Sequence, residues 1–266
     1  MGPILNAVAA MGGIGLVLSI ILGIASKVFY VYVDPKVVAV DACLPGANCG
    51  GCGYAGCSEC AVAIVAGEVP PNACKVGGED AAKAIAAVLG VSVETAERDI
   101  ASIFCRGDHS AAKRKYNYKG VLDCRAAALL SGGDKSCMYG CLGLGTCVAN
   151  CPFGALKMGD DGLPVVDKEL CTGCGTCVDI CPRHIPKLIK ESQKVATLCS
   201  SHDGGKVVKA ICDAGCQGCG KCKKACPEKA IIVDKFLAIV DGEKCTGCGA
   251  CFEDCPTGII QSLVAA

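Results

Sequence analysis

The sequence has no tryptophan, and its other aromatic residues make up only 4% of the 266 residues. Because large aromatic side chains usually dominate the packing of big apolar cores, their scarcity favours small domains built around inorganic groups. Charge is balanced as well: 26 Lys and Arg match 26 Asp and Glu, so no nucleic-acid footprint is indicated. The three histidines, His109, His184 and His202, are dispersed without metal-site or catalytic-triad spacing.

A credible nucleotide site is also missing. Gly51-Cys52-Gly53-Tyr54-Ala55-Gly56 matches a dinucleotide fingerprint letter by letter. No strand precedes it, no βαβ unit surrounds it, and a cysteine lies inside it, so the match is rejected. We therefore expect neither NAD nor flavin on this chain.

Cysteine, in contrast, is abundant: 26 residues, together with 35 glycines. Such a count requires a choice between disulfides, zinc and iron–sulfur clusters. The stretch from Cys171 to Pro182 has the spacing C-x2-C-x2-C-x3-C-P, which is the bacterial ferredoxin run for [4Fe–4S] clusters. In two-cluster ferredoxins the fourth cysteine of each run ligates the other cluster, so this run predicts a partner run.

Partner runs are present, and they define two modules. The first module has an expanded leading run, Cys137-x3-Cys141-x5-Cys147-x3-Cys151-Pro152. The second repeats the pattern as an internal duplication. Crossing the fourth ligands predicts four clusters, with these ligands: Cys137, Cys141, Cys147 and Cys181; Cys151, Cys171, Cys174 and Cys177; Cys216, Cys219, Cys222 and Cys255; and Cys226, Cys245, Cys248 and Cys251.

A fifth cluster is predicted nearer the N-terminus. Cys49, Cys52, Cys57 and Cys74 have the spacing C-x2-C-x4-C-x16-C, so one turn-rich loop would supply three ligands and the returning chain the fourth. Six cysteines remain. Cys43 and Cys60 are expected to be buried small residues, whereas Cys105, Cys124, Cys199 and Cys212 leave a sixth cluster open as an alternative.

Zinc and disulfides explain the pattern less well. Structural zinc sites usually separate two C-x2-C pairs by a dozen or more residues, unlike these repeated runs ending in proline. Disulfides require an oxidising compartment, and the predicted topology places the cysteines in the cytoplasm.

An apolar N-terminal segment is the basis of that topology. From residue 4 to 33 the chain has one charge, Lys27, and is dominated by apolar and small residues; about 20 such residues suffice to cross a bilayer core. Lys27 and Lys36 follow this segment, so the positive-inside rule places the rest of the chain on the cytoplasmic side. A secretory signal peptide is the alternative, but the basic leading region is missing and the apolar stretch is too long.

Local patterns predict further elements. Residues 58–66 form a short amphipathic stretch. Residues 81–89 and 93–104 are expected to form two helices, the second capped by Ser92, while 155–158 and 163–166 form a β-hairpin. Short strands are expected at 194–198 and 206–211.

A basic cluster at 113–119 has two interpretations. It is either a solvated surface or a docking patch for an acidic redox partner. The sequence leaves both open.

Together these features predict an α+β protein with a single N-terminal transmembrane helix, a small 4Fe–4S domain and two bacterial 2[4Fe–4S] ferredoxin-like modules. The expected divisions are a transmembrane anchor at 1–33, a 4Fe–4S domain with short helices at 34–105, a connecting segment at 106–135, a first module at 136–193, a linker at 194–211 and a second module at 212–266.

The whole chain closely resembles the B subunits of Rnf complexes. The resemblance rests on the anchor, on Pro45-Gly46-Ala47-Asn48-Cys49-Gly-Gly-Cys52-Gly-Tyr-Ala-Gly-Cys57, on Pro71-Asn72-Ala-Cys74, and on the paired ferredoxin runs. It implies a membrane-anchored polyferredoxin that takes electrons from reduced ferredoxin and relays them within an ion-translocating ferredoxin:NAD⁺ oxidoreductase. The chain would have no independent catalytic site.

The implied partners are soluble ferredoxin, other membrane subunits, a flavin-bearing subunit and the lipid bilayer, with the clusters on the cytoplasmic side of the inner membrane. Shorter family members carry one ferredoxin module, whereas this chain has two. The alternative function is an electron-transfer subunit of another membrane redox enzyme, such as a hydrogenase or a quinone-linked reductase.

Overall fold

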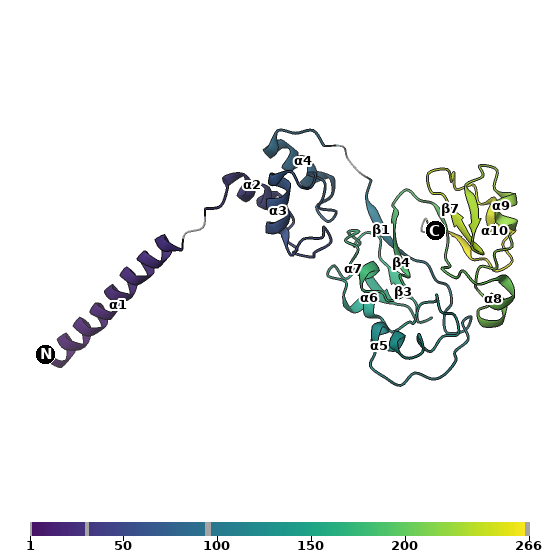
Figure 1. Ribbon diagram of the computed structural model, residues 1–266, viewed down its shortest axis with the longest axis horizontal. Helices are drawn as coiled ribbons and strands as arrows, with labels where there is room; N and C mark the ends of the chain where they lie inside the picture. Colours follow the sequence, from purple (N-terminus) through teal and green to yellow (C-terminus); the bar gives the residue numbers. More distant parts are fainter. Residues whose placement is uncertain (1, 30–31, 94–96, 264–266) are drawn as a thin grey trace.

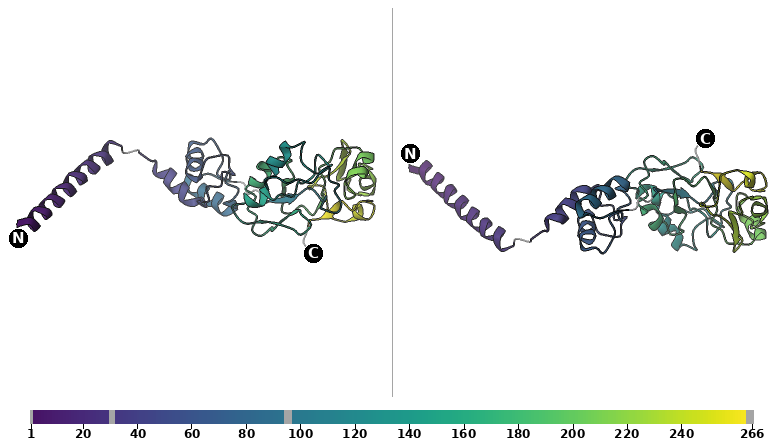
Figure 2. Two further views of the ribbon diagram at one scale, coloured as in Figure 1. Left: turned by 90° about the horizontal axis from the view of Figure 1, so that it is seen from below. Right: turned by 90° about the horizontal axis from the view of Figure 1, so that it is seen from above.

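The computed structural model of the protein describes residues 2–29, 32–93 and 97–263. The molecule is elongated, with helix α1 at one end and the last ferredoxin-like module at the other (Figures 1 and 2). Within the described residues the strands form four sheets of two strands each. Two-stranded sheets are marginally stable alone, so other contacts must hold the modules together.

Helix α1 (Gly2–Val28) projects away from the rest of the molecule (Figure 1). Its segment Val8–Val28 has 21 residues, none of them buried, and is long and apolar enough to cross a membrane. The prediction of an apolar N-terminal helix is therefore confirmed. Phe29 and Tyr32 after it are exposed, as an interfacial aromatic pair would be, while Tyr30 lies outside the described residues.

Three helices form the next domain: α2 (Pro35–Cys43), α3 (Cys57–Ala66) and α4 (Gly78–Leu89). Helix α2 begins at Pro35, and the Asp34 carboxylate caps it by accepting the Lys36 N–H at 2.8 Å. Val40, Ile64 and Ile85 are at most 3% exposed and form its apolar centre. This domain thus has a conventional side-chain core.

The helix predicted for 93–104 is wrong where the structure describes it. Residues 94–96 lie outside the described part, and Asp99–Ile103 form strand β1, antiparallel to β4 (Pro186–Lys190), with Ile100 opposite Ile189. Ile100 is 1% exposed and Ile189 is 8% exposed. Tertiary pairing prevails over the local helical pattern because it buries these β-branched side chains.

The sheet of β1 and β4 packs into the core of the first ferredoxin-like module. Its predicted β-hairpin is confirmed as β2 (Leu156–Met158) and β3 (Pro164–Val166), with Leu156 opposite Val166. Its helices are very short: α5 (Cys124–Leu129), α6 (Thr146–Ala149) and α7 (Thr176–Asp179). Because β1 comes from before the module and pairs with β4, the preceding segment is part of the same structural unit.

The second module repeats this plan. Strand β5 (Val195–Thr197) pairs with β8 (Ile260–Ser262), and β6 (Ile231–Asp234) pairs with β7 (Leu237–Val240). Its helices are α8 (Gly205–Ile211), α9 (Lys221–Ala225) and α10 (Ala250–Glu253).

The strand predicted at 206–211 is wrong, because α8 occupies these residues. Val208 on α8 is buried, whereas Val207 is half exposed, and a Cβ on Gly215 would lie 2.4 Å from Val208. This helix therefore packs one side against the following loop.

Candidate iron–sulfur centres

Five groups of four cysteines are predicted as cluster ligands, and the structure brings most members of each group together. We number the sites along the molecule. Site 1 is Cys49, Cys52, Cys57 and Cys74; site 2 is Cys151, Cys171, Cys174 and Cys177; site 3 is Cys124, Cys141, Cys147 and Cys181; site 4 is Cys216, Cys219, Cys222 and Cys255; and site 5 is Cys226, Cys245, Cys248 and Cys251. The cysteines of sites 2 to 5 line one cavity per site.

Site 1 combines Cys49 and Cys52 from the loop between α2 and α3, Cys57 at the start of α3, and Cys74 from the segment between α3 and α4. The Asn48 side-chain oxygen accepts the Cys57 N–H at 2.8 Å and so fixes the start of α3. Cys74 is brought back by the returning chain, and its Sγ accepts the Gly77 N–H at 3.4 Å. Burial raises the pKa of Cys74, the hydrogen bond from Gly77 N–H opposes this shift, and the nearby Cys52, Cys57 and Cys49 add to it. The four thiols are therefore close enough to interact.

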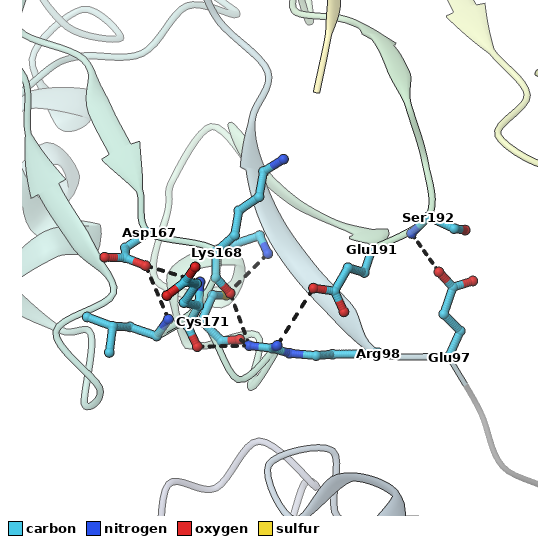
Figure 3. Close-up of polar contacts among 10 residues, drawn as sticks. Glu97, Arg98, Asp167, Lys168, Cys171, Glu191 and Ser192 are labelled. Atoms are coloured by element: carbon cyan, nitrogen blue, oxygen red, sulfur yellow. Dashed lines mark hydrogen bonds and ion pairs between the residues drawn. The ribbon is translucent and has the colours of Figure 1, made fainter. Parts of the chain in front are cut away.

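Site 2 is held by the ordered loop shown in Figure 3. The Arg98 guanidinium donates to the backbone carbonyls of Lys168, Glu169 and Cys171, and its other nitrogen lies 3.7 Å from the Glu191 carboxylate. On strand β1, which follows Arg98, the Ala101 N–H donates to Cys171 Sγ at 3.3 Å. Strand β1, missed by the sequence prediction, thus supplies a hydrogen bond to a ligand sulfur, and Arg98 just before it holds the loop.

The four cysteines of the run from Cys171 to Pro182 belong to two different sites, site 2 and site 3. Cys171, Cys174 and Cys177 line one cavity together with Cys151, whereas Cys181 lines the neighbouring cavity with Cys141 and Cys147. The structure thus places these cysteines in the crossed arrangement that the sequence predicts. Ile185 N–H donates to Cys181 Sγ at 3.4 Å, and Ala230 N–H donates to Cys226 Sγ at 3.3 Å, after the last cysteine of the second module's leading run.

Site 3 departs from the predicted group. Its cavity is lined by Cys124, and Cys137 lines a different cavity. Cys124 begins α5, and its N–H donates to the Thr146 hydroxyl at 2.6 Å, which holds it beside the Cys147 loop. The charge of Cys124 is the second cause, after burial, that raises the pKa of Cys147 to about 11.

The sequence of the loop explains why Cys124 takes the place of Cys137 in site 3. In the second module the loop is Cys216-Gln217-Gly218-Cys219-Gly220-Lys221-Cys222; in the first it is Cys141-Leu142-Gly143-Leu144-Gly145-Thr146-Cys147. Both loops have the same shape, because a Cβ on Gly143 or Gly218 would lie 2.6 Å from the carbonyl of a hairpin-turn residue, Gly162 or Phe236. Leucine therefore stands where the second module has Cys219, and Cys124 brings a sulfur to the site from outside the loop.

The sequence contains a signal that Cys137 lies outside the ferredoxin run, but the spacing within the run alone does not reveal it. Five cysteines of the first module each have a counterpart one repeat later, at an offset of 75 residues: Cys124, Cys137, Cys141, Cys147 and Cys151 correspond to Cys199, Cys212, Cys216, Cys222 and Cys226. Aligning the repeats in this way matches Cys141 to Cys216 and leaves Cys137 outside the run. The expanded spacing is therefore a standard run that lacks its second cysteine.

Burial shifts the pKa values of several thiols in these sites upward. Burial raises the pKa of Cys141 and Cys177 to about 12 and that of Cys222 to about 11. Such thiols stay protonated without a cation, and cluster binding must displace their protons. Among the described residues, no group of three or more His, Cys, Asp or Glu side chains is arranged to hold a single metal ion. A cubane places each thiolate on a different iron, which suits more widely spaced sulfurs.

The basic cluster at 113–119 is partly used inside the first module. Arg114 lies 3.3 Å from the Asp134 carboxylate, and Lys115 Nζ donates to the Ser131 carbonyl at 2.8 Å. Tyr116 and Tyr118 donate their hydroxyls to the carbonyls of Leu130 and Val121. These contacts use four of the seven residues of the cluster inside the module, and the choice between a solvated surface and a docking patch stays open.

Comparisons with known proteins agree with this chemistry. A family model for an Fe–S cluster matches residues 44–76, and a 4Fe-4S dicluster domain model matches twice, at residues 136–185 and 215–260. Together these ranges contain all the cysteines of sites 1 to 5 except Cys124. The two dicluster matches fall on the two repeated modules.

Relatives match nearly the whole chain. The B subunit of the ion-translocating oxidoreductase complex of Methanosarcina acetivorans is 50% identical over 91% of both chains. The B subunit of the Na⁺-translocating ferredoxin:NAD⁺ oxidoreductase complex of Acetobacterium woodii is 46% identical over 92% of this chain and 73% of its own length. The proton-translocating counterpart from Clostridium ljungdahlii is 44% identical over 91% of this chain and 85% of its own. The chain therefore belongs to the family of B subunits of ion-translocating oxidoreductase (Rnf) complexes.

Proposed function

We propose that this chain accepts electrons from reduced ferredoxin and relays them, one at a time, within an ion-translocating ferredoxin:NAD⁺ oxidoreductase complex. The observation that carries the proposal is the row of cysteine-lined sites along one elongated chain. Five [4Fe–4S] clusters, one at each of sites 1 to 5, would supply the one-electron chemistry. The protein holds them, donates N–H groups to their sulfurs and excludes water, all of which set reduction potentials.

Neighbouring sites share short pieces of chain, which supports fast transfer between them. Cys147 of site 3 lies in α6 and Cys151 of site 2 follows this helix closely, and Cys177 and Cys181 are related in the same way around α7. The second module couples sites 4 and 5 identically through α9 and α10. Such sharing keeps two clusters together in a small fold.

The second module is the proposed entry point for electrons. It lies at the end of the molecule farthest from α1 (Figure 2). Of the 26 cysteines only Cys219 and Cys248, in sites 4 and 5, are exposed. Lysines at the end of α9, Lys223 and Lys224, would steer an acidic donor toward them.

Site 1 is the proposed exit toward the membrane. It belongs to the domain that follows α1, and Lys27 and Lys36 after the apolar segment favour a cytoplasmic position for all the sites. From site 1 electrons would pass to membrane subunits, and a separate flavin-bearing subunit would reduce NAD⁺ while an ion crosses the membrane. The anchor would cross the membrane once.

The contact between sites 1 and 2 provides an experiment. Gly51, between two cysteines of site 1, packs so closely on site 2 that a Cβ there would lie 2.4 Å from the Cys174 carbonyl oxygen. Gly51→Ala is therefore expected to push the two sites apart. Ferredoxin-driven turnover of the assembled complex should fall several-fold, with iron content unchanged.

Gly204→Ala is the matched control, because a Cβ at Gly204 meets nothing within 4 Å and its φ is −62°. Equal turnover of the two variants, each with full iron content, would contradict a route through sites 2 and 1.

A further inference from the structure

Four cysteines outside sites 1 to 5 surround a cavity between the two ferredoxin-like modules. Cys105 and Cys137 come from the first module and its leading strand segment, and Cys199 and Cys212 come from the start of the second. Cys137, Cys199 and Cys212 are each at most 9% exposed. We call this the interface cavity.

The sulfurs converge on this cavity. Gly107 lies against two of them: a Cβ there would be 3.4 Å from Cys212 Sγ and 3.6 Å from Cys105 Sγ. The backbone bridge between Ala112 and Cys212 joins the two modules at the same place. Cys137 interacts electrostatically with Cys105, and Cys212 with both of them.

Backbone N–H groups surround the sulfurs as they do in the other sites. Cys105 Sγ accepts from Gly107 N at 3.4 Å and from Cys141 N at 3.3 Å. Cys199 Sγ accepts from Ser201 N and Cys216 N, both at 3.4 Å. N–H donors aimed at sulfur stabilise thiolates and tune the potential of a cluster.

We propose that the interface cavity binds a sixth [4Fe–4S] cluster through Cys105, Cys137, Cys199 and Cys212. The inference rests on the proposed electron-relay function and extends it. Binding exchanges four thiol protons for four Fe–S bonds. In transfer, one electron leaves the reduced cluster of site 4, reduces this cluster, and passes on to site 3, so each step oxidises one cluster and reduces the next.

The interface cavity lies where a cluster could carry electrons between the two modules. The N–H of Cys141, a site 3 ligand, donates to Cys105, and the N–H of Cys216, a site 4 ligand, donates to Cys199. The interface cavity therefore lies directly between sites 3 and 4. A cluster in it would divide the electron transfer between the modules into two shorter steps.

Two basic side chains, the buried Lys135 and the half-buried Arg183, donate to backbone carbonyls of residues that line the cavity. Arg183 donates to the Cys137 carbonyl at 2.9 Å, and Lys135, 1% exposed, donates to the Gly107 carbonyl at 2.5 Å. Both offset the negative charge that four thiolates bring to a cluster.

The repeat accounts for the ligand set. Cys199 and Cys212 are the counterparts, 75 residues later, of Cys124 and Cys137. Since Leu144 has no sulfur, Cys124 is used in site 3. In the second module Cys219 is present, which leaves Cys199 for the interface cavity. The sequence-based alternative of Cys105, Cys124, Cys199 and Cys212 thus differs from this set in one member.

The test is iron and acid-labile sulfide per chain in the full-length protein, purified anaerobically in detergent. Six cubanes give about 24 of each per chain. Cys199→Ser and Cys137→Ser should each remove about four irons, and the double variant should remove the same four, because both residues ligate one cluster. Cys124→Ser combined with Cys137→Ser should remove about eight, because these belong to different clusters. Cys43→Ser, outside every site, is the control with no loss.

Each other outcome overturns the proposal. About 20 irons, with Cys199→Ser unchanged, would leave five clusters and the relay intact but refute the sixth. One extra iron or zinc without extra sulfide would indicate a single-ion site. Additive losses for Cys137→Ser and Cys199→Ser would separate them into different centres. Zinc throughout, with no sulfide, would instead refute the proposed function itself.

Discussion

Cys52→Ala is expected to abolish ferredoxin-driven NAD⁺ reduction by the assembled complex. Cys52 lies in the loop of site 1 and packs against the core formed by α2, α3 and α4. Site 1 is the last proposed centre before the membrane subunits, so its loss leaves no conducting route around it. Turnover should fall to that of a complex without this subunit, while about 20 of 24 irons remain bound.

Cys43→Ala is the matched control in the same domain. Cys43 is on α2, and its sulfur is used in a hydrogen bond to the Ala39 carbonyl at 3.3 Å. This variant should retain full turnover. Undiminished turnover in Cys52→Ala, with the expected iron loss, would show that electrons bypass site 1.

Removal of the clusters is expected to unfold both ferredoxin-like modules. The core of the second module consists of ten buried residues, four of which are cysteines: Cys199, Cys216, Cys222 and Cys251. Its sheets have two strands each, which are marginal without further support. Structural zinc supplies about 10–16 kcal/mol to small zinc-binding domains, and a loss on that scale is as large as the whole free energy of unfolding of a typical domain, about 5–15 kcal/mol.

Hydrogen exchange after oxidative removal of iron and chelation measures this effect. Amides of β6 and β7 should lose their protection, whereas those of α4 should retain part of theirs, because Val40, Ile64 and Ile85 form a core without cluster ligands at its centre. The α4 helix thus serves as an internal control. Full protection of β6 and β7 in iron-free protein would contradict a cluster-dependent fold.

The sequence predicted the architecture well where the pattern is local. The ferredoxin runs, the hairpin of β2 and β3 and the apolar helix α1 all follow from short-range spacing. Strand β1 was missed because its partner β4 lies nearly 90 residues later, and such pairing is invisible to a local helical pattern. Helix α8 was missed because two adjacent valines favour a strand until packing decides between them.

The ligand groups also differ in whether local spacing or long-range contacts determine them. The crossed sets of sites 2, 4 and 5 follow from spacing alone. Site 3 required knowing that α5 folds back onto the Cys147 loop, so that Cys124 stands in for the cysteine absent at Leu144. The interface cavity required knowing how the modules face each other. Only comparison of the two repeats position by position could have suggested either arrangement.

Titration of the full-length chain with reduced ferredoxin tests the central claim most directly. Under anaerobic conditions, electrons from ferredoxin should bleach the visible absorbance of the chain and produce cluster EPR signals, up to about one electron per cluster. An iron-loaded chain that takes up no electrons from reduced ferredoxin would contradict the account.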